Sequence, residues 1–137
     1  MTIDNLIFDK ESDTFETIIN NGDKSFDLTL CDFKKGDEVS ATRLANKICA
    51  WLDINFDNAK KYAARELIEA KNDNWLEEDE LPITESQFME TIEFDGILAF
   101  SDDSFQIFFD DGKLFAGHHI VVDVDKKFNF EGVDIAG

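Results

Sequence analysis

The side chains best suited to chemistry in this chain lie between Asp95 and Asp125, where its only two histidines, His118 and His119, stand among aspartates. Histidine and carboxylate groups that converge could bind a divalent metal ion or transfer protons. Neighbouring residues of a strand point to opposite faces of a sheet, so we do not expect both rings to hold one ion. We expect His118 to be a hydrogen-bonded histidine of the core and His119 to pair with Asp123.

A small metal-assisted hydrolase that uses His118 or His119 with nearby aspartates is the alternative function that this segment suggests. The sequence places no serine or cysteine beside either histidine as a nucleophile. We therefore predict no catalytic residue, and an enzyme is the second hypothesis rather than the first.

The aspartates of this segment fall at the turns of a predicted meander, where oxygen ligands could bind calcium or magnesium. Because a meander reverses at each turn, the side chains that should gather at one end of the sheet are Asp102, Asp103, Asp123 and Asp125. An EF-hand loop is excluded, because Lys127 stands at its third ligand position and Phe128 replaces the required glycine. We expect solvated turns, with no metal site and no cofactor.

The charge of the chain points to the kind of partner it could bind. The formal net charge is −18, and residues 73–137 alone carry seventeen acids against three bases, whereas residues 36–72 are neutral. Such a field repels the phosphates of nucleic acids and anionic membrane surfaces. It attracts a basic protein and accelerates the encounter, although the acids could also serve only solubility. The first hypothesis is therefore a non-catalytic protein-binding module, in broad composition similar to immunity proteins that neutralise basic toxins.

Trp75 stands beside a run of acids and is the kind of aromatic anchor that protein interfaces use. The predicted interaction surface combines this tryptophan with the acidic connector and the acidic turns: Trp75, Glu77, Glu78, Asp79, Glu80, Asp102, Asp103, Asp123 and Asp125. The competing interpretation is that Trp51 and Trp75 both close the edge of the core.

Length and composition predict one folded domain over residues 1–137. The chain is 43% hydrophobic and contains fourteen phenylalanines, which is enough for a core without disulfides. We expect Cys31 and Cys49 to be reduced thiols, and the weakly apolar N-terminus to be no signal peptide. These features predict a cytoplasmic protein.

The elements that must position these residues follow from hydrophobic periodicity. Apolar and polar residues alternate on both sides of Asn21-Gly22, which predicts a β-hairpin with a type I′ turn at that pair. A short strand over residues 6–8 would precede it. From Asp37 the period lengthens to about 3.6, which predicts a helix. The segment 53–58 interrupts that pattern, and a second helix is predicted from Asp57 to Lys71.

Thr84-Glu85-Ser86-Gln87 matches a capping box, so a third helix should begin at Glu85. The last block reads as a meander with turns at residues 101–104 and at Asp111-Gly112. That register pairs Phe105 with His118, puts Phe115 on the opposite face, and gives this core face: Phe105, Ile107, Phe109, Leu114, Ala116, His118, Ile120, Val122 and Val124. A bulge at Gly117 would shift the register. The prediction is an α+β domain in which two or three helices, between the N-terminal hairpin and the C-terminal meander, pack on one face of a mainly antiparallel sheet.

The run from Phe109 to Val122, FDDGKLFAGHHIVV, resembles the C-terminal pattern of an uncharacterised bacterial family, domain of unknown function 2262. The segment from Thr84 to Phe88 is similar in kind, and the resemblance covers the last two-thirds of the chain. It implies a bacterial cytoplasmic protein. It also marks Gly117-His118 as the position that could be special, and it gives His119 no role.

Overall fold

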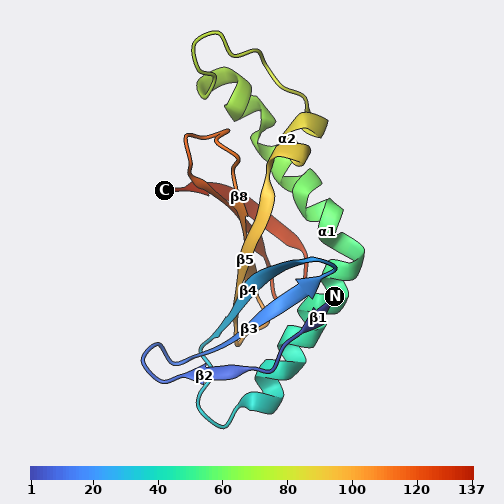
Figure 1. The fold of residues 1–137 in the computed structure, drawn as a ribbon, viewed down its shortest axis with the longest axis vertical. Helices are drawn as coiled ribbons and strands as arrows, with labels where there is room; N and C mark the ends of the chain where they lie inside the picture. Colours follow the sequence, from blue (N-terminus) through green and yellow to red (C-terminus); the bar gives the residue numbers. More distant parts are fainter.

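One long helix lies across one face of a twisted sheet (Figure 1). The computed structural model describes residues 1–137. Its strands and helices, in chain order, are β1 (Thr2–Ile3), β2 (Ile7–Asp9), β3 (Thr14–Asn21), β4 (Lys24–Cys31), α1 (Glu38–Asn74), α2 (Glu85–Thr91), β5 (Glu93–Phe100), β6 (Phe105–Asp110), β7 (His119–Val124) and β8 (Phe130–Ala136). The order in the sheet is β1-β3-β4-β5-β6-β7-β8, and β2 also pairs with β3.

The α+β class and the mainly antiparallel sheet are confirmed, with one exception to the pairing. β4 and β5 are parallel, and both helices lie in the connection between them. A parallel pair requires such a crossover, because a tight turn can join only antiparallel strands. The core fills the space between α1 and the sheet, and it includes the alternate residues Phe15, Ile19, Leu28 and Leu30 of β3 and β4.

The predicted break between two helices at residues 53–58 is wrong, because α1 runs through it without interruption. This segment contains neither proline nor glycine, and its polar residues Asp53 and Asp57 fall on the solvent side. Phe56 continues the inner stripe and stacks on Phe94 of β5, with ring centroids 4.1 Å apart. Asn55 Nδ2 donates to the Trp51 carbonyl 3.1 Å away, so this side chain adds a bond within the helix. The structure therefore has two helices.

The N-terminal hairpin is confirmed, but its turn lies one residue later than predicted. Asn21 pairs with Lys24, so the turn consists of Gly22 and Asp23. Gly22 takes a φ of +67°, whereas Asn21 stays in the strand. The capping box of α2 forms as predicted: Thr84 Oγ1 accepts from the Gln87 N–H, and Gln87 Oε1 accepts from the Thr84 N–H.

The turn at residues 101–104 is confirmed, but the tight turn at Asp111-Gly112 is wrong. Asp110 pairs with His119 rather than Lys113, and residues 111–118 form a long loop. Phe105 therefore pairs with Val124, not with His118. Of the predicted core face, Ala116 is exposed and His118 is half-buried, whereas the other members are buried. Phe115, predicted for the opposite face, is fully buried. Neither helix is long and apolar enough to cross a membrane.

Candidate functional site: the open face of the sheet

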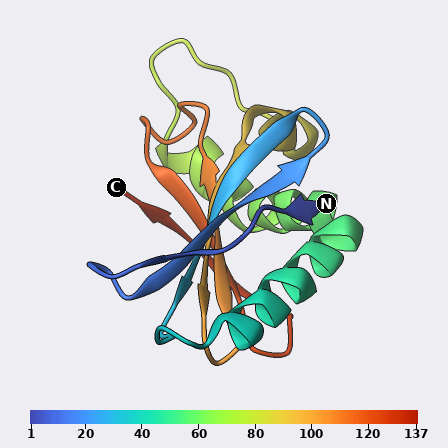
Figure 2. The same ribbon diagram turned by 60° about the horizontal axis from the view of Figure 1, so that its bottom comes forward.

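The face of the sheet that points away from α1 carries no helix (Figure 2). Successive strand residues point to opposite faces, so this face is formed by the residues that alternate with the buried core positions. In strands β3 to β8 they include Glu16, Ile18, Asp27, Thr29, Asp95, Gly96, Leu98, Gln106, Phe108, Asp110, His119, Val121, Asp123 and Asp134. We call this surface the open face.

The open face has one sign of charge. Six of its side chains are carboxylates (Glu16, Asp27, Asp95, Asp110, Asp123 and Asp134), and none is lysine or arginine. The cations lie elsewhere, and α1 carries six of the thirteen, balanced by six acids. Only His119 could add a positive charge to this surface. A negative field is therefore expected over the open face.

Apolar side chains lie among the carboxylates of the open face, and its middle is slightly hollowed. Ile18 is 38% exposed, Leu98 and Phe108 are half-buried, and Val121 is buried between neighbouring strands. A shallow hollow of about 250 Å³ lies over β4, β5 and β6, with Asp27 and Phe108 in its lining. A smaller one of about 180 Å³ lies between Glu16 and Asp27. Protein interfaces combine apolar contacts with polar ones, and this surface offers both.

The predicted interaction surface is divided between distant parts of the fold. Trp75 and the acidic connector lie beyond the C-terminal end of α1, at one end of the molecule (Figure 1). The turn at residues 101–104 follows the far end of β5. Asp123 alone belongs to the open face, where its Oδ1 accepts from Gln106 Nε2 at 2.9 Å. The predicted residues therefore do not form one continuous patch.

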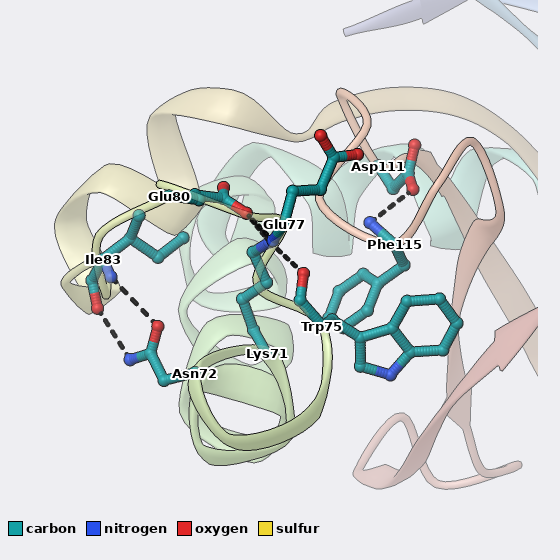
Figure 3. A network of polar contacts seen from close by, with 8 residues as sticks. All are labelled: Lys71, Asn72, Trp75, Glu77, Glu80, Ile83, Asp111 and Phe115. Atoms are coloured by element: carbon teal, nitrogen blue, oxygen red, sulfur yellow. Dashed lines mark hydrogen bonds and ion pairs between the residues drawn. The ribbon is translucent and has the colours of Figure 1, made fainter.

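Trp75 contributes to a closed network of contacts at the end of α1 (Figure 3). Its indole lies edge-on to Phe115 and His118, with centroid distances of 5.5 Å and 5.6 Å. Its carbonyl accepts from Lys71 Nζ at 2.7 Å, and the same ammonium pairs with Glu80 Oε1 at 2.9 Å. Trp75 is half-buried and closes the edge of the core, while Glu77 and Glu78 remain exposed.

Lys71 is a residue that the sequence analysis missed. Its side chain is 1% exposed. A lysine near the end of a helix is normally expected to be solvated. Its ammonium is satisfied by Glu80 and by the Trp75 carbonyl, which fixes the connector to α1. Asn72 adds a second clamp, since its side chain donates to the Ile83 carbonyl and accepts from the Ile83 N–H.

The Glu80 contacts give a pH-dependent contribution to stability. The Glu77 N–H and the Lys71 ammonium hold the pKa of Glu80 below its ordinary value of 4.5. A depressed pKa in the folded state stabilises the fold above the ordinary pKa, and this stabilisation is lost as the pH falls through the folded pKa. We expect Glu80→Gln to lower the melting temperature at pH 7, and the difference from the parent chain to shrink below pH 4.5. Thermal unfolding of both chains between pH 7 and pH 3 measures this, and a difference independent of pH would contradict it.

The two histidines have separate surroundings. His118 Nδ1 donates to the Phe115 carbonyl, and its ring lies against Trp75. His119 projects from the open face, where its Nε2 lies 3.1 Å from Asp95 Oδ2, so the predicted pairing with Asp123 is wrong. Both members of that pair are about half exposed. The carboxylate that contacts His119 thus comes from β5, two strands away in the sheet, and not from β7 itself.

The carboxylates of the acidic turns have partners within the chain: Asp102 and Asp125 bind groups of their own turns, and Asp103 binds a lysine. Asp102 Oδ1 accepts from the N–H and the hydroxyl of Ser104, which lowers the pKa of Asp102. Asp125 Oδ1 accepts from the N–H groups of Lys127 and Asn129, and Asp103 pairs with Lys47 at 3.3 Å. No group of three or more His, Cys, Asp or Glu side chains is placed to hold a metal ion.

Asp111 organises the loop that precedes β7, and it was also missed. It is 2% exposed, and its two oxygens accept from the N–H groups of Lys113, Phe115 and Gly117 at 2.8–3.0 Å. Four residues of the loop adopt the left-handed backbone conformation, with positive φ at Gly112, Lys113, Ala116 and Gly117. This carboxylate seats Phe115 in the core beside Trp75.

The two cysteines are free. Burial, with smaller effects from nearby charges, raises the pKa of both the Cys31 and the Cys49 thiol, so neither favours the reactive thiolate.

Comparison with known proteins gives one match, to a family model described as "Uncharacterized protein conserved in bacteria (DUF2262)". Neither curated proteins nor solved structures give a match. The family match covers residues 1–135, so it includes the N-terminal hairpin as well as the C-terminal two-thirds that the resemblance covers. The chain therefore belongs to the bacterial DUF2262 family.

Proposed function

We propose that this chain is a non-catalytic protein-binding module, and that its open face holds a basic protein. The observation that carries the proposal is the composition of that face: at least six carboxylates, no lysine or arginine, and apolar side chains among them at Ile18, Leu98 and Phe108. A partner that fits this surface presents lysine and arginine together with apolar side chains. An acidic partner would place like charges opposite each other, which costs several kcal/mol of binding free energy. The open face therefore discriminates against acidic partners.

The role that this chemistry fits best is that of an immunity-type inhibitor in the cytoplasm, which captures a basic toxin and blocks its working surface. Long-range attraction from a net charge of −18 would speed capture. Toxins that act on nucleic acids are basic for the same electrostatic reason, since they must bind phosphates. The neutral charge of α1 leaves the helix side of the molecule outside this interaction.

Capture from the bacterial host tests the proposal. The tagged chain is incubated with host lysate at about 50 mM and about 300 mM salt, and retained proteins are identified by mass spectrometry. We expect a stoichiometric basic partner at low salt that is depleted at the higher salt, because screening weakens attraction between surface charges. Retention of an acidic partner, or of none at either salt, would contradict the proposal.

A further inference from the structure

A third hollow lies where the turn end of β3–β4, the middle of α1 and the start of β5 meet. Its volume is about 470 Å³, within the range of small-molecule pockets. Three phenylalanine rings, one from each element, form its apolar lining: Phe26, Phe56 and Phe94. Phe94 stacks on Phe56 and lies 5.5 Å from Phe26, so the three rings form one continuous surface.

Two lysines, Lys24 and Lys60, line the same hollow. The ion pairs of the structure join Met1 to Asp53 and three other couples, and neither lysine takes part in any of them. Both ammonium groups are therefore free of a direct carboxylate contact in this structure. Two cations that face one hollow can hold an anion by charge-assisted hydrogen bonds, with Glu93 as the one carboxylate in the lining.

The electrostatics of Lys60 agree with this geometry. Burial lowers the pKa of the Lys60 ammonium, and the charge of Lys24 lowers it further, while Asp57 and Glu93 act in the opposite direction. An anion placed between the two lysines would relieve the repulsion between them. Asn21 and Ser25, also in the lining, offer uncharged hydrogen-bonding groups at the rim.

We propose that this hollow binds a small organic anion, whose carboxylate or phosphate lies between Lys24 and Lys60 and whose flat apolar part lies on Phe26, Phe56 and Phe94. The site is distinct from the basic-protein surface, since neither Lys24 nor Lys60 belongs to the open face. Glu93, which also lines the hollow, selects against ligands with a second negative group at that side.

Titration calorimetry with phenyl phosphate and with benzoate tests the site and separates the two anion types. Inorganic phosphate and benzyl alcohol serve as probes that lack the ring and the charge, respectively. We expect at least one aromatic anion to bind in the micromolar to low millimolar range, and both incomplete probes to bind about tenfold more weakly. No binding of either aromatic anion up to about 10 mM would overturn the proposal.

Variants locate the binding. Lys60→Met keeps the aliphatic stem and removes the charge, and Lys24→Met does so at an exposed strand end where folding is not at risk. Each should weaken binding of the better anion about tenfold, as expected for loss of one charged hydrogen bond. Lys61→Met is the matched control, because Lys61 is adjacent on α1 but lies outside the hollow. Equal effects of Lys61→Met and both other variants would overturn the proposal.

Discussion

Asp111→Ala should destabilise the fold by about 3–5 kcal/mol, because a buried carboxylate that accepts three backbone hydrogen bonds is removed. The N–H groups of Phe115 and Gly117 would be left without an acceptor, and the left-handed residues of the loop would lose the group that holds them. Phe115 is fully buried beside Trp75, so loosening the loop also loosens the end of the core. Urea unfolding of both chains measures the change as a shift of the midpoint at constant slope.

Asp110→Ala is the matched control for this experiment. Asp110 is the neighbouring aspartate, but it is exposed and accepts only from the Gly112 N–H. Its removal should cost less than about 1 kcal/mol. If Asp111→Ala were no more destabilising than Asp110→Ala, the assignment of Asp111 as the organiser of this loop would be refuted.

Reversal of two charges on the open face, in the variant Glu16→Lys/Asp27→Lys, should weaken binding of the captured basic partner about 100-fold at about 150 mM salt. Both carboxylates are exposed and line the same small hollow. Lysines there would face the partner's own cations. Neither residue makes an ion pair in the free chain, so the fold should be unaffected.

The double variant Glu77→Lys/Glu78→Lys carries the same change of net charge on the acidic connector. The connector extends beyond α2 at one end of the molecule, away from the open face (Figure 1). At this salt the Debye length is about 8 Å, so charges there act only weakly on the partner. We expect less than about a threefold loss of affinity for this variant. A larger loss than for the open-face variant would move the binding surface to the connector.

The parts of the fold that were predictable from sequence are those with local causes. The alternation around the first hairpin and the capping box of α2 each depend on residues within a few positions of one another. The open face could be predicted only in part. Alternation shows which residues of a strand point away from the core, but it does not show which strands pair with each other. The parallel pairing of β4 with β5, which brings Asp27 beside Gly96, is set by the helical crossover and has no local signal.

Where prediction failed, tertiary contacts outweighed a local signal. The polar segment 53–58 suggested a break in the helix. Phe56 instead stacks on Phe94 of the sheet, and the helix continues through the segment. Asp111-Gly112 is a strong turn pair, yet burial of Phe115 draws the chain into a longer loop. Lys71 is buried because Glu80, nine positions away, folds back onto it. Each of these outcomes depends on a distant partner.

Carboxyl footprinting, in which exposed acids are coupled to an amine and counted by mass spectrometry, tests the proposed function most directly. The chain is labelled alone and with the basic partner captured from the host. The proposal predicts that the partner reduces labelling of Glu16, Asp27 and Asp95, while Glu77 and Glu78 are labelled as in the free chain. Protection of Glu77 and Glu78 with unchanged labelling of the open face would contradict it.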